Sequence, residues 1–417
     1  MAVILMGTGG SSGRTLAALA AALAQYLPDQ PIRFVDTQPF NLRTGGITGY
    51  DGPGAILRAH PDACGLKRYT ASWSANMVLN GGQRVYRRMI DYAAGLIGAD
   101  ADVVVTCHDR IYIETAMLAA ARRQGAATVL LQEGPFCAIG HGAPRSGLLR
   151  AKALAAPLAT RLLRVLPPMP DYGMAGHDRV IAASDSYRAR WIAAGLAPET
   201  VVVGGIPRFD PLASLRGRAG DAGPLRVLYL VQPFAAHGKV DAAAAYGVQR
   251  VLAEGLNAAA AARPLALTIR SHPRSSGDDA AVLRAALRFA VTEDRGAAPL
   301  EAVLPEVDLV IGHYSSGMLE ALLANRPVVC VPVPTTAFAE AAEADKQRWL
   351  TGIGIPVAAT AEAIADVLVQ ADGVPATVDW GKVGDEVGTV DGHAAARCAG
   401  LIAEVVANRA GVTRGSR

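Results

Sequence analysis

One loop in the second half of the chain gathers side chains that suit a phosphate group. The stretch TIRSHPR at 268–274 places Arg270, His272 and Arg274 close together, and Pro273 fixes the turn between them. Arginine and histidine donors in such a cluster favour a diphosphate or a phosphate ester, whereas ion pairing within the loop is the alternative reading. The spacing therefore predicts an anion site or an internally paired loop.

A second loop, GHYSSGMLEAL at 312–322, places Ser315, Ser316 and Gly317 where a helix is expected to begin. Hydroxyl groups, free backbone N–H groups and the positive end of the helix dipole would converge there on one anion. We expect Glu320 to face the same site from the first helical turn. The alternative is that one of the serines caps the helix while Glu320 reaches back as in a capping box, and both roles can coexist.

The first half of the chain offers a candidate general base. In LLQEGP at 130–135, Glu133 directly follows an expected buried strand, and Gly134 keeps the turn tight. A carboxylate at that position suits proton abstraction, although an exposed glutamate is the simpler reading. His108 and His141 also follow expected strands and are secondary candidates, each more typical of a polar loop residue than of a catalyst.

The glycine-rich stretch GTGGSSGRT at 7–15 follows the first expected strand and opens a helix. Backbone N–H groups of Gly9, Gly10, Ser11 and Ser12 could approach a phosphate or a sugar closely. The glycines do not have the GxGxxG spacing of a dinucleotide fingerprint. Ligand contact and a plain tight turn are therefore both open.

The elements that position these loops follow an alternating pattern of short apolar runs and longer Ala/Leu-rich segments of helical period. This alternation predicts βαβ units and a parallel sheet in each half, an α/β fold of two Rossmann-like domains. Ligands of such sheets bind beyond the carboxyl ends of the strands, where the candidate residues lie. The expected strands are 2–7, 32–36, 102–107, 127–132, 179–184, 200–205, 226–233, 265–273, 308–316 and 328–334.

The domain boundary is expected in SLRGRAGDAGP at 214–224, which is rich in glycine and charge and has no periodicity. This gives an N-terminal domain of residues 1–214 and a C-terminal domain of residues 224–417. The last expected helix, near 391–408, could pack on either domain.

The charge balance gives no indication of a nucleic-acid partner. Lys plus Arg number 40 against 37 Asp plus Glu, a net charge of +3, and aromatic residues are only 5% of the chain. The five cysteines are scattered and never in CxxC spacing, which fits a reducing cytoplasm better than disulfides or zinc. The basic amphipathic segment 148–166 is either an ordinary solvated helix face or a peripheral contact with the inner face of the plasma membrane.

Two of these motifs carry a resemblance to a known family. RSHPR followed by DLVIGHYSSGMLEALLANRPVV resembles the donor half of GT-B glycosyltransferases, especially the bacterial surface-polysaccharide branch of sialyl-, polysialyl- and Kdo-transferases and CDP-glycerol glycerophosphotransferases. His272-Pro273 and Ser315-Ser316 match its HP and paired-serine motifs. Gln132-Glu133-Gly134 stands where the transferases for CMP-activated acidic sugars carry an acidic-acidic-Gly motif, so one acid is missing.

The resemblance implies two domains facing across a cleft and transfer of a sugar from a nucleotide-activated donor, CMP-sugar favoured, to a hydroxyl of a glycan, glycolipid or small molecule. It implies an inverting reaction with Glu133 as base; His141 or Asp51 would be examined next. No DxD-type motif lies in one of the candidate loops, so we expect no obligatory metal and no other cofactor. The donor-binding candidates are Gln232, Arg270, His272, Pro273, His313, Ser315, Ser316, Gly317 and Glu320, and the acceptor-side candidates are Gly9, Gly10, Ser11, Ser12 and His141.

Two other functions remain open. Non-hydrolysing UDP-sugar 2-epimerases share the fold and an Arg/His-Pro loop, but carry Ser-Gly-Gly-Glu-Glu where this chain has Ser-Ser-Gly with Glu320 downstream. A non-catalytic nucleotide-sugar sensor would keep the donor loops without needing a base. The effect of replacing Glu133 separates a sensor from an enzyme.

Overall fold

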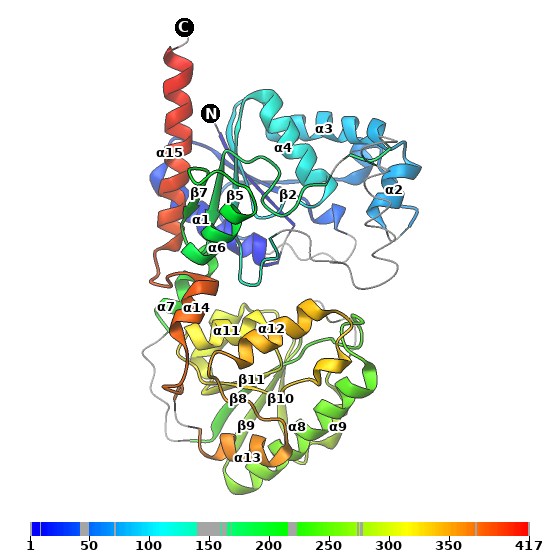
Figure 1. Cartoon of the computed structure of the whole chain (residues 1–417), viewed down its shortest axis with the longest axis vertical. Helices are drawn as coiled ribbons and strands as arrows, with labels where there is room; N and C mark the ends of the chain where they lie inside the picture. Colours follow the sequence, from blue (N-terminus) through cyan, green and yellow to red (C-terminus); the bar gives the residue numbers. More distant parts are fainter. Residues whose placement is uncertain are drawn as a thin grey trace. The chain divides into compact units, whose positions relative to one another are not determined.

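The computed structural model describes residues 2–8, 10–41, 50–70, 72–139, 160, 165–167, 169–215, 223–272, 275, 278–371 and 373–415, with side chains as far as 409. The chain divides into two compact units. Unit 1 comprises Met1–Asp210 and Gly384–Arg417, and unit 2 comprises Pro211–Val383. Each unit contains one parallel β-sheet with helices packed against it (Figure 1).

The sheet of unit 1 has the strand order β3-β2-β1-β4-β5-β6-β7, and every neighbouring pair is parallel. The order reverses between β1 and β4, so their carboxyl ends form the topological switch point where such sheets bind ligands. The strands are β1 (Ala2–Gly7), β2 (Ile32–Asp36), β3 (Ala55–Arg58), β4 (Ala101–Thr106), β5 (Ala127–Leu131), β6 (Arg179–Ala182) and β7 (Val201–Val203).

The α/β fold class predicted from the sequence is confirmed, and six of these seven strands coincide with predicted ones. The sequence prediction missed β3. Three of its four residues are exposed, because it lies at the edge of the sheet, and it therefore lacks the buried apolar run that marks the other strands.

Helices cover both faces of this sheet. One apolar core lies between the sheet and the helices α1 (Ser11–Tyr26) and α15 (Ala394–Gly415). The other lies under α2 (Trp73–Leu79), α3 (Gln83–Ile97) and α4 (Tyr112–Gln124). In α3 the buried side chains recur every fourth residue, which places one helix face on the sheet: Val85, Met89, Ala93 and Ile97. The other helical segments of unit 1 among the described residues are η1 (Gln38–Phe40), η2 (Pro61–Cys64), α6 (Asp185–Ala193), η4 (Pro207–Phe209) and α7 (Asp210–Ala213), which continues into unit 2.

The end of the chain belongs to unit 1, whereas the sequence pattern predicts that all of 224–417 lies in the C-terminal domain. Helix α14 (Trp380–Val387) spans the division between the units, and α15 follows in unit 1. The reason is apolar burial, since Cys398 and Ile402 of α15 are fully buried in the core that α1 shares. Asp210 caps α15 by accepting hydrogen bonds from the N–H groups of Ala394 and Ala395 at 2.9 and 2.8 Å.

The sheet of unit 2 has the strand order β10-β9-β8-β11-β12, again entirely parallel, with its switch point between β8 and β11. The strands are β8 (Leu225–Leu230), β9 (Leu265–Arg270), β10 (Val291–Asp294), β11 (Leu309–Gly312) and β12 (Val328–Cys330). The helical segments are α8 (Ala242–Ala262), α9 (Ala281–Ala286), α10 (Leu300–Val303), η5 (Leu304–Glu306), α11 (Ser316–Leu323), η6 (Thr335–Ala337), α12 (Ala341–Thr351) and α13 (Ala361–Val369). Within the described residues, no helix is both long and apolar enough to cross a membrane.

We predict that Ile402→Ala lowers the free energy of unfolding of unit 1 by about 2–5 kcal/mol, because it opens a cavity in a fully buried core position. Chemical denaturation followed by circular dichroism measures the loss. Glu404→Ala, an exposed position on the same helix, is the control and should change the value by less than about 0.5 kcal/mol. Equal effects of the two substitutions would contradict the packing of α15 on unit 1.

Candidate functional site

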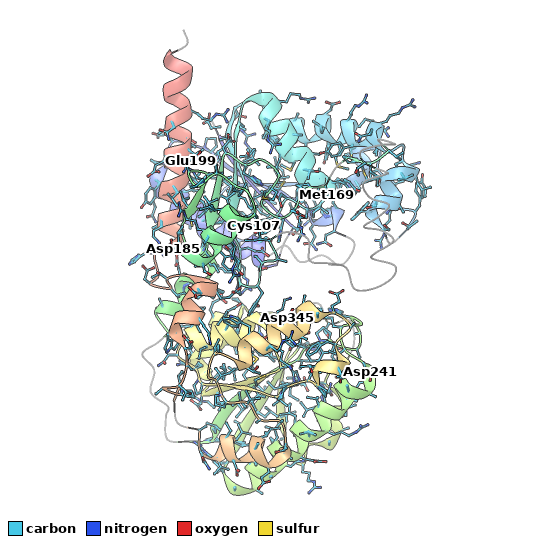
Figure 2. All side chains as sticks on the ribbon, in the orientation of Figure 1. Cys107, Met169, Asp185, Glu199, Asp241 and Asp345 are labelled. Carbon is cyan, nitrogen blue, oxygen red and sulfur yellow. The ribbon has the colours of Figure 1, made fainter. Side chains whose placement is uncertain are left out.

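Four loops of unit 1 meet at the carboxyl edge of its sheet. They follow β1, β4, β5 and β7, and all of these strands run in the same direction. The loop after β4 begins at Cys107, which Figure 2 labels within this unit. Polar side chains placed on these loops therefore share one edge of the sheet, as the sequence analysis expected.

Glu133 is the centre of this edge. Its carboxylate accepts hydrogen bonds from the hydroxyl groups of Ser11, at 3.2 Å, and Ser12. Its backbone carbonyl accepts from the Arg208 guanidinium Nε at 2.9 Å and from the Thr15 hydroxyl at 3.4 Å. The structure thus brings together the predicted base and two predicted acceptor-side residues, and it fixes both ends of the glutamate.

The start of α1 supports the negative charge of Glu133. Ser11 and Ser12 are the first two residues of α1, so the positive end of the helix dipole lies beside the carboxylate. Gly10 precedes them with φ +69° and ψ −131°, a conformation that residues with a side chain rarely adopt. A Cβ there would contact nothing within 4 Å, so backbone conformation and not space requires the glycine.

His108 pairs with the same carboxylate. Its Nε2 lies 3.1 Å from Oε1 of Glu133, and the two side chains are 34% and 15% exposed. Burial alone would raise the pKa of Glu133, but the charge and hydrogen bond of His108, the Ser12 hydroxyl and Arg208 outweigh it and lower the pKa to about 2. Burial likewise opposes charging of His108, yet Glu133 raises its pKa to about 9. At neutral pH the pair is an ion pair.

A buried network holds the His108 loop. Asp109 accepts hydrogen bonds from the N–H groups of Gly173 and Ala175 at 3.0 and 3.3 Å and lies 3.2 Å from His177 Nε2. Glu114, at the start of α4, accepts from the N–H groups of two residues of the same loop. Burial raises the pKa of Glu114 to about 7, an effect that the positive charge of His108 partly offsets. Sequence patterns gave no signal for this network, because its members come from separate segments.

The side chain of Gln132 has a structural role. Its Oε1 accepts a hydrogen bond from Ala183 N–H at 2.9 Å, and its Nε2 donates to the Gly134 carbonyl at 3.0 Å. A carboxylate could not make the second bond because, once ionised, it has no donor. This explains physically why an amide stands where the resembling motif has an acid.

In unit 2, Gln232 and His313 are engaged within the protein. Gln232 follows β8 and exchanges two hydrogen bonds with the backbone of Tyr314 across the switch point, at 2.6 and 3.0 Å. Burial lowers the pKa of His313 to about 4, so its ring is neutral. Nδ1 lies 2.7 Å from the Val331 carbonyl and Nε2 lies 2.9 Å from the Tyr229 hydroxyl. Both predicted residues therefore shape the loop after β11, and neither His313 nitrogen remains for a ligand.

Arg270 forms an ion pair within the protein, which is the alternative to anion binding that the sequence left open. It is buried, contacts Asp294 at the end of the neighbouring strand β10, and donates to the Ala298 carbonyl. The sequence did not show that β10 would carry this partner to the same edge. His272 lies beside the ring of His237, with ring centroids 6.2 Å apart.

The loop before α11 matches the predicted anion site in one respect. Ser315 is the N-cap residue, but its hydroxyl makes no cap hydrogen bond, and this buried oxygen has no hydrogen-bond partner among the described residues. Ser316 is exposed as the first helical residue, and Gly317 follows with Leu230 3.0 Å from where a Cβ would lie. Hydroxyls and helix N–H groups therefore gather beside the switch point of unit 2.

The predicted role of Glu320 in the first turn is wrong. Helix α11 begins at Ser316, which places Glu320 in the second turn, where it is buried. A capping box needs the acid at the third helical position, which Met318 occupies. Of the other predicted residues, Gly9, His141 and Pro273 lie outside the described residues, as does most of 148–166.

A cavity of about 460 Å³ in unit 2 was not predicted. It lies between α8 and the loop that follows β12, and its lining is mostly apolar. Its walls include Ala244, Gly247, Val248, Val251 and the segment 331–335. Among the described residues, no cluster of three or more His, Cys, Asp or Glu side chains is arranged to hold a metal ion.

No family model and no curated protein sequence matches the chain. Several solved structures, however, match its fold. The wall teichoic acid polymerase TagF is 13% identical, with a TM-score of 0.52 over 98% of this chain and 90% of that one. A putative UDP-N-acetylglucosamine 2-epimerase from Listeria monocytogenes is 14% identical, with a TM-score of 0.59 over 96% and 95%. The UDP-GlcNAc 2-epimerase of Neisseria meningitidis, bound to UDP-GlcNAc, is 10% identical, with a TM-score of 0.55 over 98% and 100%. The likeness confirms the GT-B class of fold.

The ion pair between Glu133 and His108 can be tested by the titration of His108. We expect its NMR signals to show a pKa of about 9 in the wild type and, in Glu133→Gln, a pKa at or below its ordinary 6.5, because burial then dominates. His313, with a pKa of about 4, is the internal control and should not change. An unchanged His108 pKa in the variant would exclude the pair.

The contribution of this ion pair to the stability of the folded protein depends on pH. The stabilisation that comes from the raised pKa of His108 is complete below pH 6.5 and is lost as the pH rises through about 9. The part due to the lowered pKa of Glu133 is complete above 4.5 and is lost as the pH falls through about 2.

Proposed function

We propose that this protein is a glycosyltransferase that transfers a sugar from a nucleotide-activated donor to an acceptor hydroxyl. The observation that carries the proposal is the Glu133 carboxylate, held ionised at the carboxyl edge of unit 1 by Ser11, Ser12 and His108. An ionised carboxylate fixed at a ligand-binding edge can accept a proton without first losing one. The fold likeness to TagF and to the nucleotide-sugar 2-epimerases supports a nucleotide-sugar substrate.

In the proposed reaction the donor phosphate binds unit 2 at the N-terminus of α11. The Ser315 hydroxyl and the N–H groups of the first helical turn would face the leaving phosphate, where charge develops in the transition state. Gln232 holds this loop by its two hydrogen bonds to Tyr314. His272 would approach from the loop after β9.

The proposed reaction transfers one proton from the acceptor to the protein. Glu133 takes the proton of the acceptor hydroxyl while the acceptor oxygen bonds to the anomeric carbon. The bond from that carbon to the phosphate breaks, and the nucleotide leaves with the electron pair. Attack opposite the leaving group inverts the anomeric carbon. Residues of this chain suffice for these steps, and we propose no metal and no other cofactor. A CMP-sugar donor is the preferred choice, because the HP and paired-serine motifs resemble those of transferases for CMP-activated sugars.

The choice of donor is tested by a thermal-shift screen of CMP-, CDP-, UDP- and GDP-sugars. A nucleotide sugar at about 100 times its dissociation constant should stabilise the folded protein by about 2.7 kcal/mol. A 2-epimerase would also bind its donor, so each hit is then incubated in D₂O without acceptor. Deuterium at C2 of the sugar would indicate the epimerase, and product formation only with an added hydroxyl acceptor would indicate the transferase.

We predict that Glu133→Gln lowers kcat and kcat/KM together by about 10²–10⁴-fold and leaves donor affinity nearly unchanged. The amide preserves the shape of the side chain but cannot take the proton. Glu199→Gln, at an exposed position of the same unit (Figure 2), is the control and should retain full activity. Wild-type turnover by Glu133→Gln would remove Glu133 from the mechanism.

A second prediction concerns the donor site. Ser315→Ala combined with Ser316→Ala should weaken binding of the nucleotide sugar at least tenfold with little loss of stability, because Ser315 makes no cap hydrogen bond. Thr360→Ala is the matched control, since Thr360 caps α13 through its 3.2 Å bond to Ala363 N–H. The control should lose about 1 kcal/mol of stability and keep its affinity. Calorimetry and denaturation separate the two outcomes, and wild-type affinity in the serine variant would refute the site.

A further inference from the structure

One corner of unit 1 exposes large apolar side chains together. Tyr69, Val78 and Leu79 are 59%, 44% and 59% exposed, although residues of these types are usually buried. Val78 and Leu79 are the last two residues of α2, and α3 begins four residues later (Figure 1). We call residues 67–69, 78–79, 84 and 87–88 the α2 corner.

Hydrogen bonds hold this corner together. The Asn80 side chain donates to the Lys67 carbonyl at 2.8 Å and accepts from the Lys67 N–H at 3.0 Å. The Asn76 side chain accepts from the Tyr69 N–H at 2.9 Å. These bonds fix the segment 67–69 along α2, so its exposed side chains are neighbours of the exposed end of that helix.

The same corner is strongly basic. Lys67, Arg68, Arg84, Arg87 and Arg88 are all exposed, and the sequence contains no Asp or Glu between Asp62 and Asp91. Within the described part of the chain, none of these five cations forms an ion pair with a carboxylate. Arg84, Arg87 and Arg88 have the spacing of one helix face at the start of α3. The α2 corner therefore combines unpaired positive charge with exposed apolar side chains.

We propose that the α2 corner docks on the surface of a bilayer that contains anionic lipids. The cations match the negative headgroups, and the three apolar side chains gain by entering the boundary between headgroups and acyl chains. A soluble polyanion would bind the positive charges but would not bury the apolar side chains. The combination of both therefore favours a lipid surface.

The α2 corner lies near the carboxyl edge of the sheet of unit 1, so docking there would affect the candidate site. Helix α3 leads into β4, so it begins near the carboxyl edge of the sheet, the edge that carries His108 and Glu133. The Ser74 hydroxyl of α2 lies 3.2 Å from the hydroxyl of Tyr112, the first residue of α4 after the His108 loop. If the proposed transfer function holds, docking would place this edge beside acceptors that are anchored in lipid. The docking itself does not depend on that function.

The test is flotation of the full chain with vesicles, without any nucleotide sugar. Vesicles of phosphatidylcholine with phosphatidylglycerol should bind the protein at least tenfold better than phosphatidylcholine alone. Each cation near an anionic lipid surface strengthens binding about fivefold, so Arg84→Gln with Arg87→Gln should weaken it more than tenfold. Val78→Ser with Leu79→Ser should weaken it severalfold. Absence of wild-type binding would refute the proposal, whatever the transferase assays show.

Two control variants test whether loss of charge or of exposed apolar side chains elsewhere on the protein weakens vesicle binding. Arg250→Gln with Arg295→Gln removes the same charge from exposed positions of unit 2, and Val357→Ser with Val369→Ser removes two valines that are 45% and 40% exposed. Both controls should bind vesicles as the wild type does, and circular dichroism checks folding. If inorganic polyphosphate binds as tightly as the vesicles and Val78→Ser with Leu79→Ser has no effect, the corner is a polyanion site and the lipid proposal is wrong.

Discussion

The constraint on which unit 1 depends is the largely buried negative charge of Glu133. A carboxylate withdrawn from water is costly unless hydrogen bonds and an opposite charge compensate it. Here the compensating groups come from two other segments, the start of α1 and the loop after β4. Ionisation of one side chain therefore ties three loops of the sheet into a single arrangement, and it places them at the switch point between β1 and β4.

The C-terminal part of the chain also stabilises the loop that carries Glu133. Glu386 of α14 accepts hydrogen bonds from the Phe136 N–H and from the Tyr187 hydroxyl, and Tyr187 in turn accepts from the Cys137 N–H at 3.0 Å. Phe136 has φ +59°, a conformation unfavourable for a residue with a side chain, so it needs such fixed partners. Gly388 allows the approach, because a Cβ there would lie 1.9 Å from the Ala183 carbonyl oxygen. The segment that returns from unit 2 thus helps to set the loop that carries Glu133.

The sequence predicted most strands well because buried parallel strands are continuous apolar runs. The two strands that it missed, β3 and β10, both lie at a sheet edge and have no fully buried residue. Glu133, Ser11 and Ser12 were predictable because the carboxyl ends of parallel strands share an edge. The pairing of His108 with Glu133 and of Arg270 with Asp294 was not, since each needs the order of the strands, which periodicity does not give. His313 looked like a ligand-binding residue because burial, which neutralises its ring, cannot be seen in a loop motif.

The low pKa of Glu133 bears on how such a group could act as a base. With a pKa of about 2 the carboxylate is always charged at neutral pH, yet it holds a transferred proton weakly. Three donors contact its two oxygens, and the Ser11 bond, at 3.2 Å, is the longer of the two hydroxyl bonds. An acceptor hydroxyl that takes the place of Ser11 donates the same kind of hydrogen bond, so the number of donors to the carboxylate stays the same. Exclusion of water by the bound substrate, however, increases the cost of the charge. This desolvation raises the pKa of the carboxylate while the acceptor is bound, so its basicity would increase in the state in which the proton must move.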